Sequence, residues 1–533
     1  MKGHYSDVWQ AIAQAVPDRV AISTREGTIS YGEFARQAGA LARWLEESGL
    51  RPGDSLAILL YNRPEYLVAF FAGFATGIAP TPINYRYQPG EVAELLVDSG
   101  AKAVLYPSSL ASVMTEAAAL AGTSPALLEI DDGAAPTPSA SRFTDVVARP
   151  GSLPATPPLG GELRLYTGGT TGRPKAVVWG ADDILAVQMY AIYDAAGLPR
   201  PNTVEQAVRI AADPATPERV TLPLTPFMHG TALFNSINTL VRGGRVVINV
   251  SPRLDADEAV RLAVDEGVTE LIVAGDAVTL PIVEAAERAG LTRLGRVAWA
   301  ISSGMRFSDA AKARLHALGE ITILDILAST EGGPFAASVT TGVDDLPGRL
   351  RLLPGAVVLD EGQHEIEDRP GSVGILGFRG TLPKGYWRDP DKTRVTFPTI
   401  NGVRHVVPGE WVRVLEDGFV ELLGRGSSVV NTGGEKVYPG EVEETLLAHP
   451  GVADVVVFGL PDERYGEVVT AVVSPATGAE LDAEALRAHV AERLAGYKKP
   501  RHIVVRPSLE RSPHGKIDMA RLKQSVTVEL SND

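Results

Sequence analysis

The chain of 533 residues contains no cysteine, which excludes disulfide bonds, thiolate-ligated metals and cysteine nucleophiles. It is also poor in positive charge, because 50 Lys and Arg stand against 65 Asp and Glu and give a formal net charge of -15. Binding to duplex nucleic acid or to an anionic membrane needs basic patches, so we expect neither kind of partner.

Apolar runs long enough to span a bilayer are absent as well. The longest, LVAFFAGFATGIAP, begins at Leu67, is interrupted by glycines and a threonine, and stops at Pro80. A spanning helix needs about 20 apolar residues, so we interpret this run as a buried helix. The N-terminal residues MKGHYSDVWQ lack the apolar core of a signal peptide. We therefore expect a cytoplasmic protein without a membrane span.

Short apolar runs that alternate with Ala-rich segments make up most of the chain. The runs at 55–60, 245–250, 269–273 and 296–301 have the length and composition of buried strands, and helix-like stretches lie between most of them. This alternation predicts an α/β fold with largely parallel strands. Since 533 residues exceed one compact core, we predict a large N-terminal domain of several subdomains with layered α/β sheets, residues 1–426.

The sequence pattern changes beyond about residue 425. VEETLLAHP is typical of a helix, DVVVFGL of a strand, and DAEALRAHVAERLAGYKKP has apolar residues four apart, as an amphipathic helix does. These elements predict a small α+β C-terminal domain at 427–533. The stretch 131–160, rich in Pro, Ala, Ser and Gly, is predicted to be a surface loop.

The segment YTGGTTGRPKAV, residues 166–177, has the composition of an anion-binding loop. A Gly-rich turn exposes backbone N–H groups at a concave spot, and Lys175 adds a positive charge. The spacing matches neither a Walker loop, whose lysine directly follows the second glycine of G-x4-G, nor the dinucleotide pattern G-x-G-x-x-G. Taken alone, such a stretch is more often a plain surface turn.

The same loop resembles the signature loop of the adenylate-forming superfamily, which comprises acyl- and aryl-CoA ligases, nonribosomal adenylation domains and luciferases. Further stretches resemble the other motifs of this family in the same order over nearly the whole chain, and their details are most similar to the ligases of steroid-like or other bulky acids. These stretches are PFMHG (226–230), ISSGMRFS (301–308), DILASTEGG (325–333), GYWRDPDKT (385–393), GRGSSVVNTGGEKVYPGEVE (424–443), DERYGE (462–467) and SPHGKI (512–517).

The resemblance implies a reaction in two steps. A carboxylate first attacks the α-phosphate of Mg-ATP to give an acyl-adenylate and pyrophosphate, and the thiol of coenzyme A then displaces AMP to give acyl-CoA. By resemblance, Glu331 helps to hold Mg²⁺, Lys516 bridges the carboxylate and the α-phosphate, and His229 lines the space near the acyl carbonyl. The nucleotide-binding candidates are Thr167, Gly168, Gly169, Thr170, Thr171, Gly172, Lys175, Gly304, Asp325, Leu327, Ala328, Ser329, Thr330, Glu410 and Arg425.

The resemblance also implies that the small domain swings between the two steps. The hinge falls at Ser427, where the family usually has Asp or Lys, and a serine can absorb the same dihedral change. In the second step Gly433 and Gly434 would leave room for the pantetheine arm of coenzyme A, and Lys436 would meet its phosphates. Members of the family occur as monomers and as homodimers, and the sequence does not decide between them.

The departures from the family pattern gather at the nucleotide. Leu327 replaces the aromatic residue that stacks on adenine, Ala328 and Ala176 replace glycines, and Glu410 replaces the aspartate that grips the ribose. Losing a base–aromatic stack costs about 1–3 kcal/mol, and a carboxylate misplaced by about 1 Å costs about a hundredfold in rate. These departures leave three outcomes for the adenylation step: it is retained, weakened or lost.

Three hypotheses follow from these departures. The first is a complete acyl-CoA ligase that forms the thioester of a bulky hydrophobic acid, steroid- or terpenoid-like, from ATP and coenzyme A. The second is a thioesterification-only enzyme that takes an acyl-adenylate from a partner adenylating ligase. The third is a non-catalytic acyl or nucleotide sensor, which the intact motifs on the coenzyme A side disfavour.

Overall fold

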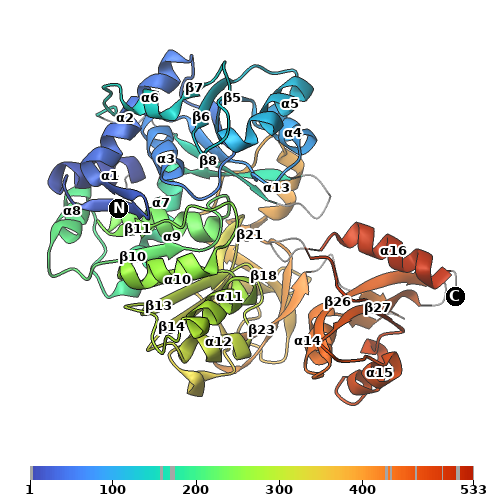
Figure 1. The fold of residues 1–533 in the computed structure, drawn as a ribbon. Helices are drawn as coiled ribbons and strands as arrows, with labels where there is room; N and C mark the ends of the chain where they lie inside the picture. Colours follow the sequence, from blue (N-terminus) through green and yellow to red (C-terminus); the bar gives the residue numbers. More distant parts are fainter. Residues whose placement is uncertain are drawn as a thin grey trace. The chain divides into compact units, whose positions relative to one another are not determined.

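The computed structural model describes residues 4–155, 160–167, 174–425, 430–432, 435–462, 465–494, 496–511 and 517–531. The chain divides into two units, coloured by residue number in Figure 1. Unit 1 comprises Met1–Pro334, Ser338–Gly348 and Arg379–Thr399, and unit 2 comprises Phe335–Ala337, Arg349–Phe378 and Ile400–Asp533. The predicted α/β class is confirmed, whereas the predicted boundary near Ser427 falls outside the described residues and stays a prediction.

A mainly parallel sheet forms the centre of unit 1. Its strand order is β2-β1-β11-β10-β12-β13-β14, and β1 and β2 are its antiparallel pair. The parallel strands are short runs of Val, Ile and Leu because both faces of the sheet are covered, which is the pattern the sequence showed. The strands are β1 (Val20–Thr24), β2 (Gly27–Ser30), β10 (Val220–Pro223), β11 (Arg245–Val247), β12 (Glu270–Val273), β13 (Trp299–Ser303) and β14 (Thr322–Ser329), and β15 (Gly332–Thr340) follows β14.

Helices cover this sheet on both faces. Figure 1 shows α10 (Ala256–Asp265), α11 (Gly275–Arg288) and α12 (Asp309–His316) beside β13 and β14, and their apolar residues form one core with the strands. A second core is aromatic and lies among α1 (Tyr5–Ala15), α2 (Tyr31–Glu47) and α3 (Pro64–Thr76), where Trp9 contacts Phe34, Phe71 and Phe74. The remaining helices of this part are α7 (Ala181–Ile192), α8 (Val204–Ala212) and α9 (Gly230–Val241).

Helix α3 is the apolar run that begins near Leu67, and ten of its residues are buried, as predicted. Among the residues that the structure describes, no helix is long and apolar enough to cross a membrane.

Unit 1 contains two smaller sheets. One has parallel strands in the order β4-β3-β5-β6-β7, and the other is antiparallel in the order β19-β9-β8. The prediction of a loop over 131–160 was wrong in part, because Phe143 and Val146 are buried and anchor a short helix against α2. The elements are β3 (Ser55–Ile58), β4 (Ala79–Pro82), α4 (Pro89–Ser99), β5 (Ala101–Pro107), α5 (Ala111–Ala121), β6 (Ala126–Ile130), β7 (Ser141–Arg142), α6 (Phe143–Val147), β8 (Glu162–Thr167), β9 (Lys175–Gly180), β19 (Gly385–Tyr386) and α13 (Pro390–Thr396).

The described strands of unit 2 fall into two groups. In the first, β16, β23, β22 and β18 are neighbours paired antiparallel, and β17 also pairs with β18. The strands are β16 (Leu350–Leu352), β17 (Ala356–Leu359), β18 (Val373–Arg379), β20 (Thr399–Ile400), β21 (Val403–Val406), β22 (Glu410–Val414) and β23 (Phe419–Arg425).

The second group of strands in unit 2 forms a sheet that packs against α14, α15 and α16, and together these elements have the α+β composition predicted for the C-terminal part. Along β26, Val455 and Val457 face one core together with α14 and α15, whereas Val456 and Phe458 face another core together with α16. This alternation is the period of two that a strand covered on both faces requires. Figure 1 shows α14 and α15 on one side of β26 and β27 and α16 on the other. The elements are β24 (Val430–Thr432), β25 (Glu435–Val437), α14 (Pro439–Leu447), β26 (Val452–Asp462), β27 (Gly466–Pro475), α15 (Ala483–Ala491), β28 (His502–Val505) and α16 (Met519–Ser531).

Candidate functional site

The predicted motifs of unit 1 follow the carboxyl ends of neighbouring parallel strands. Ser302 of β13 pairs with Asp325 of β14, so Gly304 follows β13 at the edge of the sheet where β14 leads into the turn at Thr330 and Glu331. The carboxyl edge of a parallel sheet is where open α/β folds bind their ligands. The sheet topology therefore gathers these candidates, together with the histidine motif that follows β10.

The hairpin β8–β9 carries the Gly-rich loop. Thr167, the last residue of β8, lies opposite Lys175, the first residue of β9. The strands are anchored by the buried side chains of Leu165 and Val177. Lys175 keeps a third of its side chain exposed, at 32%. The loop candidates Gly168, Gly169, Thr170, Thr171 and Gly172 lie outside the described residues.

Contacts between remote segments bring Lys175, Thr330 and Glu331 into one region. The indole Nε1 of Trp179, on β9, donates a hydrogen bond to the backbone oxygen of Thr330 at 2.9 Å. The phenol of Tyr386 donates to Glu331 Oε1 at 2.7 Å, and Lys175 forms an ion pair with Asp389. The motif GYWRDPDKT was noticed in the sequence, but its part in holding these groups was missed.

The histidine motif is fixed by a residue that the sequence did not single out. His229 is half-buried and occupies the N-cap position of α9. The side chain of Asn62 accepts from the backbone N–H of Phe227 at 2.7 Å and donates to the backbone oxygen of Thr225 at 2.9 Å. Asn62 thus holds both sides of the turn that leads to His229, and only the tertiary fold reveals it.

Asp325, one of the nucleotide-binding candidates, is the anion of a largely buried ion pair with Lys312. Its Oδ2 lies 3.0 Å from Nζ of Lys312, whose side chain is only 5% exposed. Burial raises the pKa of Asp325, and the ammonium of Lys312 opposes that rise. The other candidates of this strand and turn are half-buried or exposed, namely Leu327, Ala328, Ser329 and Thr330.

The segment after β13 is tied to the start of α11. Gly304 has a φ of +85°, the left-handed region that favours glycine. The backbone of Gly275 packs so closely against Arg306 that a Cβ at position 275 would lie 1.9 Å from the backbone oxygen of Arg306. The carboxylate of Asp276 accepts from the backbone N–H of Ser308 at 2.8 Å. Gly275 and Asp276 therefore shape the segment, and local sequence pattern did not indicate them.

Three of the candidates in unit 2 lie in described strands. Glu410 on β22 is the register partner of Arg425 on β23. Lys436 lies on β25 opposite Asn431. The candidates Ser427, Gly433, Gly434 and Lys516 lie outside the described residues.

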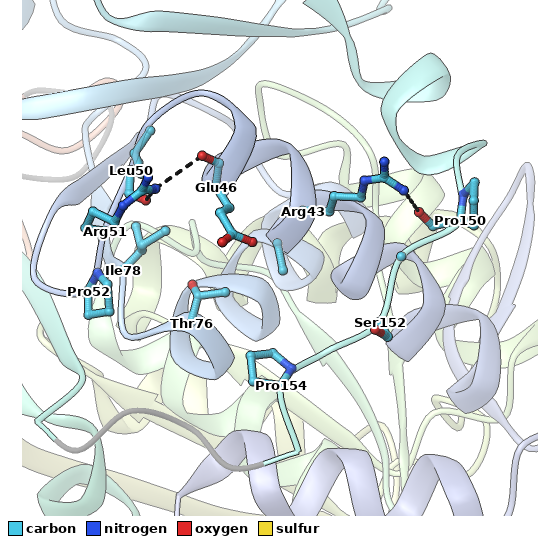
Figure 2. A pocket seen from close by; sticks show the side chains of 12 residues that line it. Arg43, Glu46, Leu50, Arg51, Pro52, Thr76, Ile78, Pro150, Ser152 and Pro154 are labelled. Carbon is cyan, nitrogen blue, oxygen red and sulfur yellow. Dashed lines mark hydrogen bonds between the residues drawn. The ribbon is translucent and has the colours of Figure 1, made fainter.

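A separate hollow of about 770 Å³ lies in unit 1 beside the end of α2, and Figure 2 shows its lining. The guanidinium group of Arg51 donates to the backbone oxygen of Glu46, and that of Arg43 donates to the backbone oxygen of Pro150. Both arginines therefore help to hold the walls together. The residues that line this hollow include none of the predicted site residues described above.

The fold and the grouped motif residues are those of an adenylate-forming enzyme. Two family models specify this further: "AMP-binding enzyme" matches residues 9–387, and "AMP-binding enzyme C-terminal domain" matches residues 441–516. The chain belongs to the AMP-binding enzyme family. The assignment to the adenylate-forming superfamily and its acyl-CoA ligases, made from the motifs, is confirmed.

Curated relatives match over nearly the full length. The chain is 35% identical to the medium-chain acyl-CoA ligase Mig of Mycobacterium avium, with 96% of each protein covered. It is 33% identical to a medium/long-chain-fatty-acid–CoA/3-oxocholest-4-en-26-oate–CoA ligase of Mycolicibacterium smegmatis, with 99% of this chain and 97% of the relative covered. A 3-oxocholest-4-en-26-oate–CoA ligase of Rhodococcus rhodochrous is 32% identical at the same coverage of 99% and 97%.

Solved structures support the same fold. ATP-bound MatB from Rhodopseudomonas palustris superimposes with a TM-score of 0.79 at 27% identity, covering 97% of this chain and 98% of that one. The anthranilate CoA ligase AuaEII in complex with anthranoyl-AMP gives a TM-score of 0.81 at 18% identity, covering 99% and 98%. The second likeness concerns the fold alone.

Proposed function

We propose that this protein is a complete acyl-CoA ligase, which joins a bulky hydrophobic carboxylic acid to coenzyme A through an acyl-adenylate. The observation that carries the proposal is the match at 32–35% identity, over 96–99% of the chain, to enzymes named as ligases of medium- and long-chain fatty acids and of a steroid acid. An acid of that size and hydrophobicity, either a long aliphatic chain or a steroid side chain, is the expected substrate class.

Binding of ATP is assigned to the hairpin β8–β9. Lys175 starts β9 directly across from Thr167, so its backbone lies where the hairpin leaves β8 and enters β9. Backbone N–H groups of such a loop and one lysine suit the β- and γ-phosphates. Thr330, whose backbone oxygen is held by Trp179, is the proposed contact to the α-phosphate.

Glu331 is the proposed protein ligand of Mg²⁺. This ion keeps several waters and usually takes one or two carboxylates together with substrate phosphates, so one carboxylate fixed by a hydrogen bond fits it. The hydrogen bond from Tyr386 restrains Glu331 and leaves its second oxygen for a further ligand. A bound Mg²⁺ would supply positive charge to the phosphates that react.

The first step brings two anions together, so positioning and positive charge contribute more than covalent chemistry does. Lys516 would neutralise both the substrate carboxylate and the α-phosphate. In the second step the thiol of coenzyme A attacks the acyl carbonyl and AMP leaves. His229 would line the space near that carbonyl. After the C-terminal domain swings about Ser427, Gly433 and Gly434 would leave room for the pantetheine arm of coenzyme A. Lys436 would meet the phosphates of coenzyme A.

Four substitutions at the nucleotide favour a second candidate, the thioesterification-only enzyme supplied by a partner adenylating ligase. They are Leu327, Ala328, Ala176 and Glu410. The comparisons give no support to a loss of adenylation, because the relatives are named as ligases over the full chain. We therefore keep ATP as the expected substrate and make the second candidate one outcome of the test.

Two matched assays decide between these functions. One follows pyrophosphate release from ATP and either dodecanoic acid or a steroid side-chain acid. The other follows acyl-CoA formation from the synthetic acyl-adenylate and coenzyme A. Activity in both supports the complete ligase, activity in the second alone supports the half-reaction enzyme, and activity in neither contradicts both. Lys175→Met should reduce the first assay selectively, with Lys102→Met, a surface lysine paired with Asp54, as the control.

A further inference from the structure

We propose that the segment Gly385–Asp389, the strap, positions the two charged groups of the adenylation site. Tyr386 orients Glu331, and Asp389 orients Lys175. The proposal rests on the proposed function, because it takes Glu331 as the magnesium ligand and Lys175 as the phosphate ligand. It adds two positioning residues, neither of which was among the predicted site residues.

The backbone of the strap is joined to the strand that carries the lysine. Gly385–Tyr386 forms β19 and pairs antiparallel with Val178 and Val177 of β9. The backbone N–H of Trp387 donates to the oxygen of Ala176 at 2.8 Å. Since β9 begins at Lys175, the strap and the lysine belong to one small sheet and keep a fixed relative position.

Trp387 anchors the strap to the body of unit 1. Its indole Nε1 donates to the backbone oxygen of Asp98 at 2.9 Å. The guanidinium carbon of the buried Arg164 lies 3.6 Å from the centre of its ring, a close cation–π contact. At the start of the strap, Gly385 has a φ of +139°, and a Cβ there would lie 2.3 Å from a methyl carbon of Thr393. The start and the middle of the strap are thus tightly packed.

Tyr386 restrains the orientation of Glu331. Its side chain is almost fully buried and its phenol donates to Glu331 Oε1 at 2.7 Å. A hydrogen bond to a carboxylate is short and about twice as strong as one between neutral groups. A half-buried glutamate in a turn would otherwise sample several rotamers. With one oxygen fixed, the second is presented in a constant direction.

Asp389 gives Lys175 a fixed counter-charge. Its Oδ1 accepts from the backbone N–H of Lys392 at 2.9 Å and so caps α13. Its Oδ2 pairs with Lys175. Because the cap holds the carboxylate, the long lysine side chain is ordered before a nucleotide arrives, and less of its rotamer entropy remains to be lost on binding.

Binding of a nucleotide that cannot react tests the strap without requiring turnover. We would titrate wild-type protein, Tyr386→Phe, Asp389→Asn and Tyr61→Phe with α,β-methylene-ATP by calorimetry over a series of Mg²⁺ concentrations. Phenylalanine keeps the ring, and asparagine caps a helix as well as aspartate does. Tyr61→Phe is the matched control, because it removes a phenol–carboxylate hydrogen bond to Asp132 elsewhere in unit 1.

Tyr386→Phe should raise the Mg²⁺ concentration for half-maximal binding about tenfold, and affinity at saturating Mg²⁺ should stay near that of the wild type. Asp389→Asn should weaken nucleotide binding about fivefold at every Mg²⁺ concentration. Neither variant should slow acyl-CoA formation from a preformed acyl-adenylate. Tyr61→Phe should match the wild type throughout.

Two results would overturn the strap proposal. The first is that both variants bind the nucleotide analogue as the wild type does. The second is that both variants lose magnesium response and nucleotide affinity to the same extent and also form the thioester more slowly. The second result would mean a merely structural segment. If the wild type binds the analogue but forms no acyl-CoA, the proposed function fails while the binding comparison still decides the strap. If the wild type does not bind the analogue, the nucleotide site is contradicted and the strap falls with it.

Discussion

The ammonium of Lys312 lies 3.0 Å from the carboxylate of Asp325, and both side chains are largely buried, at 5% and 20% exposure. The lysine comes from α12 and the aspartate from β14, so the pair joins a helix to the strand that leads into the Thr330–Glu331 turn. Removing one partner of a buried pair leaves an uncompensated charge, whereas removing both charges is much less costly.

Lys312→Met should therefore destabilise unit 1 by about 3 kcal/mol at neutral pH. Burial already raises the pKa of Asp325, and losing Lys312 should raise it further. The folded state then favours the protonated acid, so the destabilisation should shrink as the pH falls through the raised pKa. Thermal unfolding between pH 7.5 and 4.5 measures this. The double variant Lys312→Met/Asp325→Asn should recover most of the loss, and no recovery would contradict the ion-pair account.

His4, the N-cap residue of α1, should give the stability of the fold a second dependence on pH. Burial lowers its pKa from 6.5 to about 4, with Asp7 acting in the opposite direction. The unfolded chain takes up this proton below about pH 6.5 and the folded chain only near pH 4, so stability is fully present above 6.5 and is lost as the pH falls. The loss amounts to about 3 kcal/mol.

Replacing His4 by asparagine, which keeps a helix-capping group but does not titrate, isolates this effect. The Tm advantage of the wild type at pH 7.5 should shrink or reverse at pH 4.5. A Tm difference that is independent of pH would show that His4 is not buried in its neutral form.

Leu327→Tyr combined with Glu410→Asp should strengthen adenylation. A restored aromatic would stack on adenine, which is worth about 1–3 kcal/mol, so the KM for ATP should fall about tenfold or more. Pyrophosphate release at varied ATP measures it, and Val339→Tyr, at an exposed position of β15, controls for added aromatic surface. An unchanged KM would mean that residue 327 does not contact the base.

Asn62→Ala should impair catalysis through His229. The variant loses the two hydrogen bonds that fix the turn from Thr225 to Phe227, and a displacement of about 1 Å at a reacting group costs about a hundredfold in rate. We expect a lower kcat for thioester formation from the acyl-adenylate, with little change in the KM for ATP. Asn249→Ala removes a surface hydrogen bond to Asp255 and serves as the control. Equal effects of the two variants would argue against a positioning role.

The secondary structure was predictable where the local pattern is strong. Buried parallel strands such as β12 are continuous apolar runs, and the prediction at 269–273 matches Glu270–Val273. Helix α6 was missed because it has five residues and two buried apolar side chains, too few to show a helical period. Helix α16 was missed because Leu522 and Val526 give one short apolar stripe among polar and β-branched residues.

Only part of the candidate site could be predicted, because a sequence pattern shows local features and not remote contacts. Motifs such as YTGGTTGRPKAV are contiguous, so their residues can be assigned from the sequence and their order along the chain. The partners that fix them are remote: Lys175 and Asp389 are 214 residues apart, and Glu331 and Tyr386 are 55 apart. Such contacts depend on which strands become neighbours in a sheet, and composition and periodicity carry no information about that.

The central claim, an acyl-CoA ligase that works through an acyl-adenylate, is tested most directly by isotope transfer. Protein is incubated with ATP, Mg²⁺, coenzyme A and a bulky acid labelled with ¹⁸O in its carboxylate, and the products are analysed by mass spectrometry. Attack of the carboxylate on the α-phosphate and release by the thiol predict acyl-CoA together with AMP that carries one ¹⁸O. Unlabelled AMP, or ADP in place of AMP, alongside acyl-CoA would contradict the account.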